Sequence, residues 1–119
     1  QVVTLCANIF DYFTQERERL FDLIVLDPPP FAKSKQALAG ALRGYKELNL
    51  RAMKRLRPGG ILATYACSHA IDEALFTQVV AQAASDAKRS TRVIDVAQQP
   101  QDHPRILEMP ESTYLKGLI

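Results

Sequence analysis

Two patterns of apolar residues alternate along the chain, one typical of buried strands and the other of amphipathic helices. Apolar and β-rich runs that predict strands occur at 2–6, 23–26, 61–66 and 92–97. Apolar residues at helical spacing predict one helix over 45–56 and another that follows Ser68. The run at 23–26 is uninterrupted, which is typical of a strand buried on both faces. This alternation favours an α/β fold in which helices flank a parallel sheet.

Residues that start or stop helices set the expected limits of these elements. The Pro-Gly-Gly sequence at 58–60 should end the first helix, because proline cannot continue it and glycine adopts positive φ at low cost. Ser68 is expected to cap the second helix. A polar loop at 98–111 leads to a final strand at 112–119. No helix separates the last two strands, so we expect them to pair antiparallel.

Length and composition are those of one ordinary globular domain. The chain has 119 residues, 47% hydrophobic and 24% charged, and its net charge of +2 is too small to indicate nucleic-acid binding by itself. Basic side chains do gather in one segment, namely Arg43, Lys46, Arg51, Lys54, Arg55 and Arg57. They form either a solvated helix face or a surface that follows a nucleic-acid backbone.

The cysteines and the two ends of the chain indicate the cellular compartment and the domain organisation to be expected. Cys6 and Cys67 are too few and too far apart to indicate a disulfide framework or a zinc site, so we expect no metal. No secretory or membrane-spanning apolar segment is recognisable, and a reducing cytoplasm is the expected compartment. Both ends lie inside apparent strands, which suggests a piece of a longer protein. An unpaired strand edge would then favour a homodimer.

Reactive side chains follow two of the predicted strands. Asp27 comes directly after the run at 23–26, and Cys67 directly after the run at 61–66. Ligands bind beyond the carboxyl ends of strands in open α/β sheets, so adjacent parallel strands would bring the carboxylate and the thiol together. A thiolate that attacks C6 of a pyrimidine makes C5 nucleophilic, and a helix starting at Ser68 would favour that thiolate. Cys67 is therefore the candidate nucleophile; the alternative is a small buried apolar residue.

The residues after Asp27 suit a planar base. Pro28, Pro29 and Pro30 donate no N–H, and residues before proline are extended, so carbonyl acceptors lie beside a carboxylate. Phe31 offers an aromatic face for stacking. The alternative is a rigid exit from a strand that ends in a surface aspartate.

The remaining histidines and cysteine have different expected roles. His103, between Asp102 and Pro104, is a candidate contact in the long loop. His69 is expected on the exposed start of a helix, and Cys6 lies inside a predicted strand, where it is expected to be structural.

Six spaced motifs together resemble one enzyme family. They are Asp27-Pro28-Pro29-Pro30-Phe31, Arg43-Gly44-Tyr45-Lys46-Glu47-Leu48-Asn49, Pro58-Gly59-Gly60, Cys67-Ser68, Asp102-His103-Pro104 and Tyr114-Leu115-Lys116-Gly117. In this order they resemble the PUA-domain-containing cytosine-5 methyltransferases of 23S ribosomal RNA, over nearly the whole chain.

The resemblance implies the C-terminal part of a Rossmann-like class I methyltransferase fold with a reversed last strand, and S-adenosylmethionine (SAM) as cofactor. It implies that Cys67 is the catalytic cysteine and that Asp27 grips the target cytosine and borders SAM, with Pro28 and Pro29 shaping the base pocket. Asn8 takes the place of the family's aspartate near the SAM adenine. Ribosomal RNA would be the partner, contacted also by Phe31, Lys46 and His103. The Gly-x-Gly-x-Gly loop that binds SAM and the PUA domain are absent from residues 1–119.

Two other classes of function fit part of the sequence. An amino-group methyltransferase acting on a nucleic-acid base would use the Asp27-Pro28-Pro29 carbonyls but would need no thiol. A non-catalytic half-domain that self-associates through its sheet edge would need neither.

Overall fold

The computed structural model describes residues 1–16, 18–31 and 37–119. The helices are α1 (Ile9–Gln15), α2 (Leu38–Arg55), α3 (Glu73–Asp86) and the short 3-10 helix η2 (Pro110–Ser112). The strands are β1 (Phe21–Leu26), β2 (Leu56–Ala66), β3 (Val96–Ala97) and β4 (Lys116–Leu118). Among the described residues, no helix combines the length and the apolar character needed to cross a bilayer.

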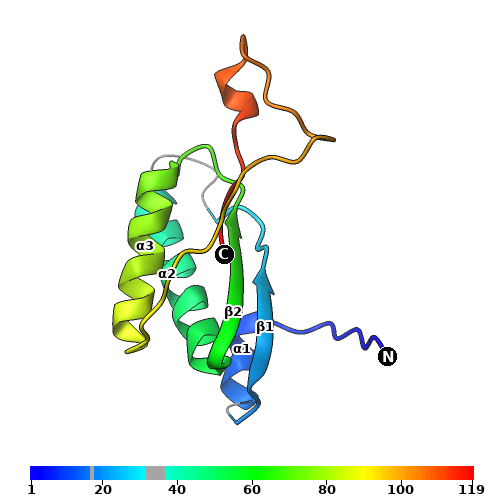
Figure 1. Cartoon of the computed structure of the whole chain (residues 1–119), viewed down its shortest axis with the longest axis vertical. Coiled ribbons are helices and arrows are strands. Elements are labelled where there is room, and N and C mark those ends of the chain that lie inside the picture. The colour runs from blue at the N-terminus through cyan, green and yellow to red at the C-terminus, as the bar shows by residue number, and fades with distance from the viewer. Residues whose placement is uncertain (17, 32–36) are drawn as a thin grey trace.

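The strands form one mixed sheet in the order β1-β2-β4-β3. β1 and β2 are parallel neighbours, while β4 runs antiparallel to both β2 and β3. The two long strands and the helices beside them are seen in Figure 1. The structure thus confirms the expected α/β class, the parallel pair and the antiparallel terminal pair.

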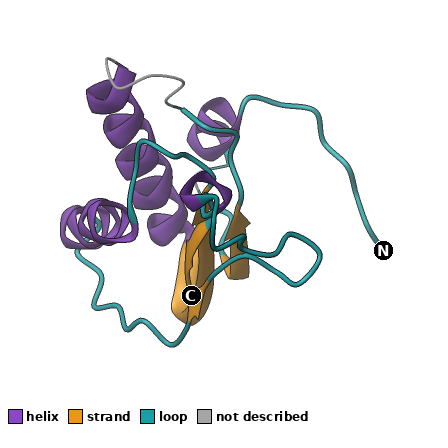
Figure 2. Cartoon of the chain, turned by 90° about the horizontal axis from the view of Figure 1, so that it is seen from above, coloured by secondary structure: helices purple, strands orange, loops and turns teal. Residues whose placement is uncertain are grey.

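The helices α1, α2 and α3 lie on one side of the sheet, as the view from above in Figure 2 shows. Ile24 and Leu26 of β1 face this side and pack with Phe13 of α1 and with α2. Leu23 and Val25 point the other way and are 55% and 59% exposed. The prediction that this strand is buried on both faces is therefore wrong for this chain, because none of the described residues covers the second face.

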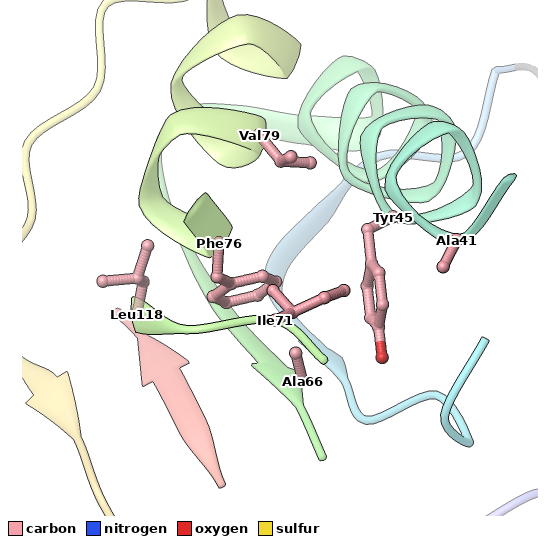
Figure 3. Packing of buried hydrophobic residues seen from close by; sticks show 7 residues of the cluster. All are labelled: Ala41, Tyr45, Ala66, Ile71, Phe76, Val79 and Leu118. Carbon is pink, nitrogen blue, oxygen red and sulfur yellow. The ribbon is translucent and has the colours of Figure 1, made fainter. Parts of the chain in front are cut away.

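A second group of apolar residues joins α2, α3, β2 and β4. Its buried members, shown in Figure 3, are Ala41, Tyr45, Ala66, Ile71, Phe76, Val79 and Leu118. The Tyr45 ring lies edge-on between two others, with its centroid 4.7 Å from that of Phe31 and 5.8 Å from that of Phe76. Such tilted aromatic contacts are favourable and help to hold α2 and the first turn of α3 together near the end of β2.

The predicted strand at 2–6 does not form. Val2, Val3 and Leu5 are 94%, 81% and 67% exposed, and no described strand pairs with them. A strand gains its stability from a neighbour that completes its backbone hydrogen bonds, so β-rich composition alone is insufficient. β3 and β4 are shorter than the expected 92–97 and 112–119, although pairing continues as the Ile94 amide donates to the Ile119 carbonyl at 2.7 Å.

Two helix limits also differ from the sequence prediction. α2 begins at Leu38, earlier than expected, and ends at Arg55 before the Pro-Gly-Gly sequence. That sequence lies inside β2, where the pairing with β1 shifts register and Gly59 has a φ of 78° that favours glycine. Ser68 does not cap α3; Asp72 does, accepting a 2.8 Å hydrogen bond from the Leu75 amide.

Candidate active site

Cys67 and the proline motif meet where β1 and β2 end. Their parallel pairing runs to Leu26 on β1, so the residues after each strand emerge at the same edge of the sheet. The Cys67 thiol donates to the Pro28 carbonyl, with 3.8 Å between sulfur and oxygen. Cys67 is partly exposed, and Asp27 is exposed. The structure therefore brings together the two segments that the sequence singled out.

Phe31 is packed against α2. Its ring is half-buried and meets Tyr45 edge-on, and an added Cβ on Gly44 would lie only 3.4 Å from the ring. The absence of a side chain at Gly44 lets the ring approach the helix closely. The ring thus anchors the end of the proline segment, a role that sequence reasoning did not assign to it.

Tyr45 is a site residue that sequence reasoning missed. Its side chain is 1% exposed, and its hydroxyl has no hydrogen bond of standard geometry among the described residues. Burial raises the pKa of Tyr45, as do the charges of Cys67 and Asp27, while the Phe31 backbone amide lowers it. The phenol therefore stays protonated, as a donor within electrostatic reach of Cys67 and Asp27. The helical stripe had marked Tyr45 only as a core residue.

Lys116 is the second residue that was missed. Its ammonium donates to the Ser68 carbonyl at 2.6 Å and to the Tyr114 carbonyl at 2.8 Å. Burial lowers the pKa of Lys116, whereas the charges of Asp72 and Cys67 raise it. A cation from β4 therefore lies next to the segment that carries the cysteine. The Tyr-Leu-Lys-Gly motif was the available signal.

The expected helix start beside Cys67 is absent. α3 begins only at Glu73, and the intervening residues form a turn in which the Ser68 hydroxyl accepts from the Ala70 amide at 3.3 Å. Because the field of a helix terminus falls off within one turn, α3 does not supply the effect on the thiol that the sequence suggested.

Three other predicted site residues lie away from Cys67. Lys46 forms an ion pair with Asp86 of α3 at 2.8 Å. His103 is exposed in the loop before η2, with its Nδ1 3.4 Å from the Asp102 carboxylate. Asn8 caps α1, where its side-chain oxygen accepts from the Phe10 amide at 2.9 Å. Each has a structural contact of its own, and the structure does not gather these three around the cysteine.

The basic segment of α2 is used mainly inside the fold. Arg51 pairs with Glu47 at 2.6 Å and also donates to the Phe10 carbonyl at 2.7 Å. Arg55 donates to the Phe13 carbonyl at 3.0 Å. These bonds fasten α1 to α2, which is a third use besides the solvated face and the nucleic-acid surface considered from the sequence.

A hollow of about 340 Å³ opens beside Lys116. Its lining includes His69, Asp72, Gln98, Gln99 and Arg105. The Gln99 amide nitrogen donates to the Ser112 carbonyl at 2.5 Å, which ties the loop after β3 to η2. The hollow thus lies between the turn after Cys67 and the loop that contains His103.

Two solved structures define the class of fold. SMU.776, a methyltransferase complexed with SAH, aligns with 94% of this chain at a TM-score of 0.77 and 23% identity. A structure described as a SAM-dependent methyltransferase from Streptococcus mutans aligns with a TM-score of 0.76. The fold is therefore the Rossmann-like fold of SAM-dependent methyltransferases.

Curated relatives give a more particular likeness. The chain is 49% identical over 115 residues to the ribosomal RNA large subunit methyltransferase I of Shewanella denitrificans, and 44% identical over 119 residues to that of Vibrio vulnificus. These alignments cover 95% and 98% of the chain but only 29% and 30% of the relatives. No protein-family model matches. The chain thus spans less than a third of the relatives' length.

Proposed function

We propose that this chain carries the target-base side of a SAM-dependent methyltransferase that modifies C5 of a cytosine in 23S ribosomal RNA. The relatives' name supports ribosomal RNA as substrate, and the proposal places the reaction in the cytoplasm. The observation that carries the proposal is the contact between the Cys67 sulfur and the Pro28 carbonyl at the ends of two parallel strands.

The chemistry requires a nucleophile on one side of the base and acceptors at its edge. The Cys67 thiolate forms a bond to C6 and makes C5 electron-rich. C5 then takes the methyl group and loses its proton to a base, and the C6–S bond breaks to regenerate the thiolate. Asp27, with the exposed carbonyls of its proline segment, would hold the exocyclic amine and ring nitrogen of the cytosine.

SAM, when bound, supplies the methyl group as an electrophile. Within this chain the two residues proposed to border it are Asn8 and Asp27. The oxygen of Asn8 is engaged by the cap of α1, which leaves its NH₂ group to meet an acceptor nitrogen of an adenine. The donor set present fits one edge of SAM, and residues outside this chain would bind the rest.

RNA would reach the site along the hollow beside Lys116. That hollow adjoins both His69 and the loop carrying His103, so nucleotides next to the target would lie there. Lys46 and Phe31 remain proposed substrate contacts only through movement of their present partners, since both are engaged within the fold.

Covalent trapping tests the proposal. RNA that carries 5-fluorocytosine cannot lose its C5 substituent as a proton, so the cysteine adduct persists and is seen as a mass increase on the protein. We expect the full-length protein and Cys6→Ala to form the adduct and Cys67→Ala to lose it, with methyl transfer reduced by at least about a thousandfold. Cys6 is an exposed cysteine and is the matched control. An adduct that survives Cys67→Ala contradicts the proposal.

The same variants discriminate an amino-group methyltransferase. The exposed Asp27 and the prolines behind it would suit an exocyclic amine, and transfer to nitrogen needs no thiol. Methylation that persists in Cys67→Ala, with the label on an exocyclic amine, would establish this second function in place of the first.

Self-association is the remaining alternative. β1 lies at one end of the strand order, and Leu23 and Val25 are exposed on its outer face. A second copy could pair with this edge. Sedimentation equilibrium of the chain would show a dimer if this occurs, and a monomer at all concentrations would reject it.

A further inference from the structure

Lys116 lies opposite the end of the strand that carries Cys67. In the antiparallel pair of β2 and β4, Lys116 is the cross-strand partner of Ala66, the residue immediately before Cys67. Cross-strand partners point to the same face of a sheet. Ala66 is fully buried against the helices, so the stem of Lys116 also starts on the covered side.

Two carbonyl groups fix the Lys116 ammonium. It donates to Ser68, the residue after Cys67, at 2.6 Å, and to Tyr114 on its own segment at 2.8 Å. An ammonium has three N–H groups, and these two bonds use two of them. Lys116 is partly exposed. A cation held by two hydrogen bonds therefore lies beside the turn that begins at Cys67.

The side chains near the turn after Cys67 differ in charge and in their contacts. The side chains of Asp27 at the exit of β1 and of Tyr45 on α2 carry no positive charge, and Asp72 at the start of α3 is a counter-charge to Lys116. His69 follows in the same turn, and its ring lies beside that of Tyr114, with 6.0 Å between centroids. Lys116 is the cation that hydrogen-bonds to the backbone of the turn after Cys67, while Arg105 lines the hollow beside it.

We propose that Lys116 is a positioning residue that holds the sulfur of Cys67 as the thiolate and fixes the turn from which it attacks. Ionisation releases the thiol proton to water, and the negative sulfur is then stabilised by the ammonium. Lys116 thereby supplies the stabilisation of the thiolate that the sequence suggested for a helix starting at Ser68. The catalytic meaning of this inference rests on the proposed function, whereas the effect on the thiol does not. The geometry that carries it is the hydrogen bond from the Lys116 ammonium to the carbonyl of Ser68, the residue after Cys67.

The test is the pH dependence of alkylation at Cys67 in the full-length protein, followed with iodoacetamide and read on the Cys67 peptide by mass spectrometry. We expect Lys116→Met to move the midpoint upward by about one pH unit, so that the rate at pH 7 falls about tenfold. Lys116→Arg keeps the charge and should restore most of the rate. A Lys116→Met midpoint equal to that of the parent, in protein with an unchanged melting curve, overturns the inference.

A second variant decides the matter if Lys116→Met does not fold. Asp72→Asn removes the competing negative charge and keeps a residue that caps α3 equally well. We expect the Cys67 midpoint to move down by a few tenths of a unit, and an unchanged or raised midpoint overturns the inference. If both thiol results hold and no 5-fluorocytosine adduct forms, the proposed function fails while the role of Lys116 stands.

Discussion

The two faces of β1 carry similar apolar side chains but have opposite surroundings. Ile24 and Leu26 pack under α1 and α2, whereas Leu23 and Val25 lie in the open. On the covered face, Phe31 packs against the same cluster and meets Tyr45 edge-on, which anchors the segment after β1 to α2. The difference shows that an uninterrupted apolar run indicates a strand that can be buried on both faces. Burial of each face still requires another segment that packs against it.

The largest expected effect separates the two faces by truncation. We expect Leu26→Ala to lower the free energy of unfolding of this chain by about 2–5 kcal/mol, because it leaves a cavity in the covered face. Val25→Ala on the open face should cost less than about 1 kcal/mol. Urea denaturation with a common m-value measures both.

The Leu26→Ala and Val25→Ala variants can also be compared in a longer protein that contains this chain. If additional chain covers the outer face, Val25→Ala should there become as costly as a buried Val truncation, about 2 kcal/mol or more. Equal and small effects of Val25→Ala in both contexts would mean that the outer face stays open to solvent.

A smaller effect is expected on the outer face of β4, where the Tyr65 ring covers Gly117. Gly117 pairs with Tyr65 across β4 and β2, and an added Cβ would lie 2.6 Å from the Tyr65 ring and 2.9 Å from the Ala97 Cβ. We expect Gly117→Ala to cost about 1–3 kcal/mol through overpacking. Thermal unfolding monitored by circular dichroism would show it.

Gly40 provides the matched control for this substitution. It lies on the exposed side of α2, and an added Cβ meets nothing nearer than the Arg43 guanidinium at 4.0 Å. Gly40→Ala should raise stability by about 0.5–1 kcal/mol because alanine is the better helix former. Similar losses for both variants would argue against a specific role for the Tyr65 ring.

Local patterns predicted most of the architecture. The runs at 23–26 and 61–66 form the parallel pair, and the lack of a helix after 92–97 gave the antiparallel end of the sheet. The failures concern partners beyond local sequence. The segment at 2–6 has no neighbouring strand, and the capping residue proved to be Asp72 because the turn after Cys67 is longer than the Ser68 signal implied.

The site was predictable to the same degree. Strand ends marked Asp27 and Cys67, since parallel neighbours must release them at one edge. Tyr45 and Lys116 could not be found in this way, because their approach to the cysteine depends on helix packing and on the register of β4. The ion pair between Lys46 and Asp86 could likewise not be predicted from local sequence, because Asp86 lies far along the chain.

The smallest expected effect concerns the buried hydroxyl on the covered side. Tyr45→Phe removes a phenol that has no standard hydrogen bond among the described residues, so its stability at pH 7 should stay within about 1 kcal/mol of the parent. The raised pKa of Tyr45 means that the unfolded chain loses this proton first. The contribution of Tyr45 to the free energy of unfolding is therefore intact below pH 10. It is lost as the pH rises through the pKa of Tyr45 in the folded protein, by up to about 1.4 kcal/mol per pH unit. Tyr45→Phe should remove this loss, so urea unfolding of the two proteins between pH 8 and about pH 11 should diverge only at the alkaline end. Parallel pH profiles of the two proteins would show that the hydroxyl is hydrated in the folded protein. They would argue against an electrostatic interaction of the phenol with Cys67 and Asp27.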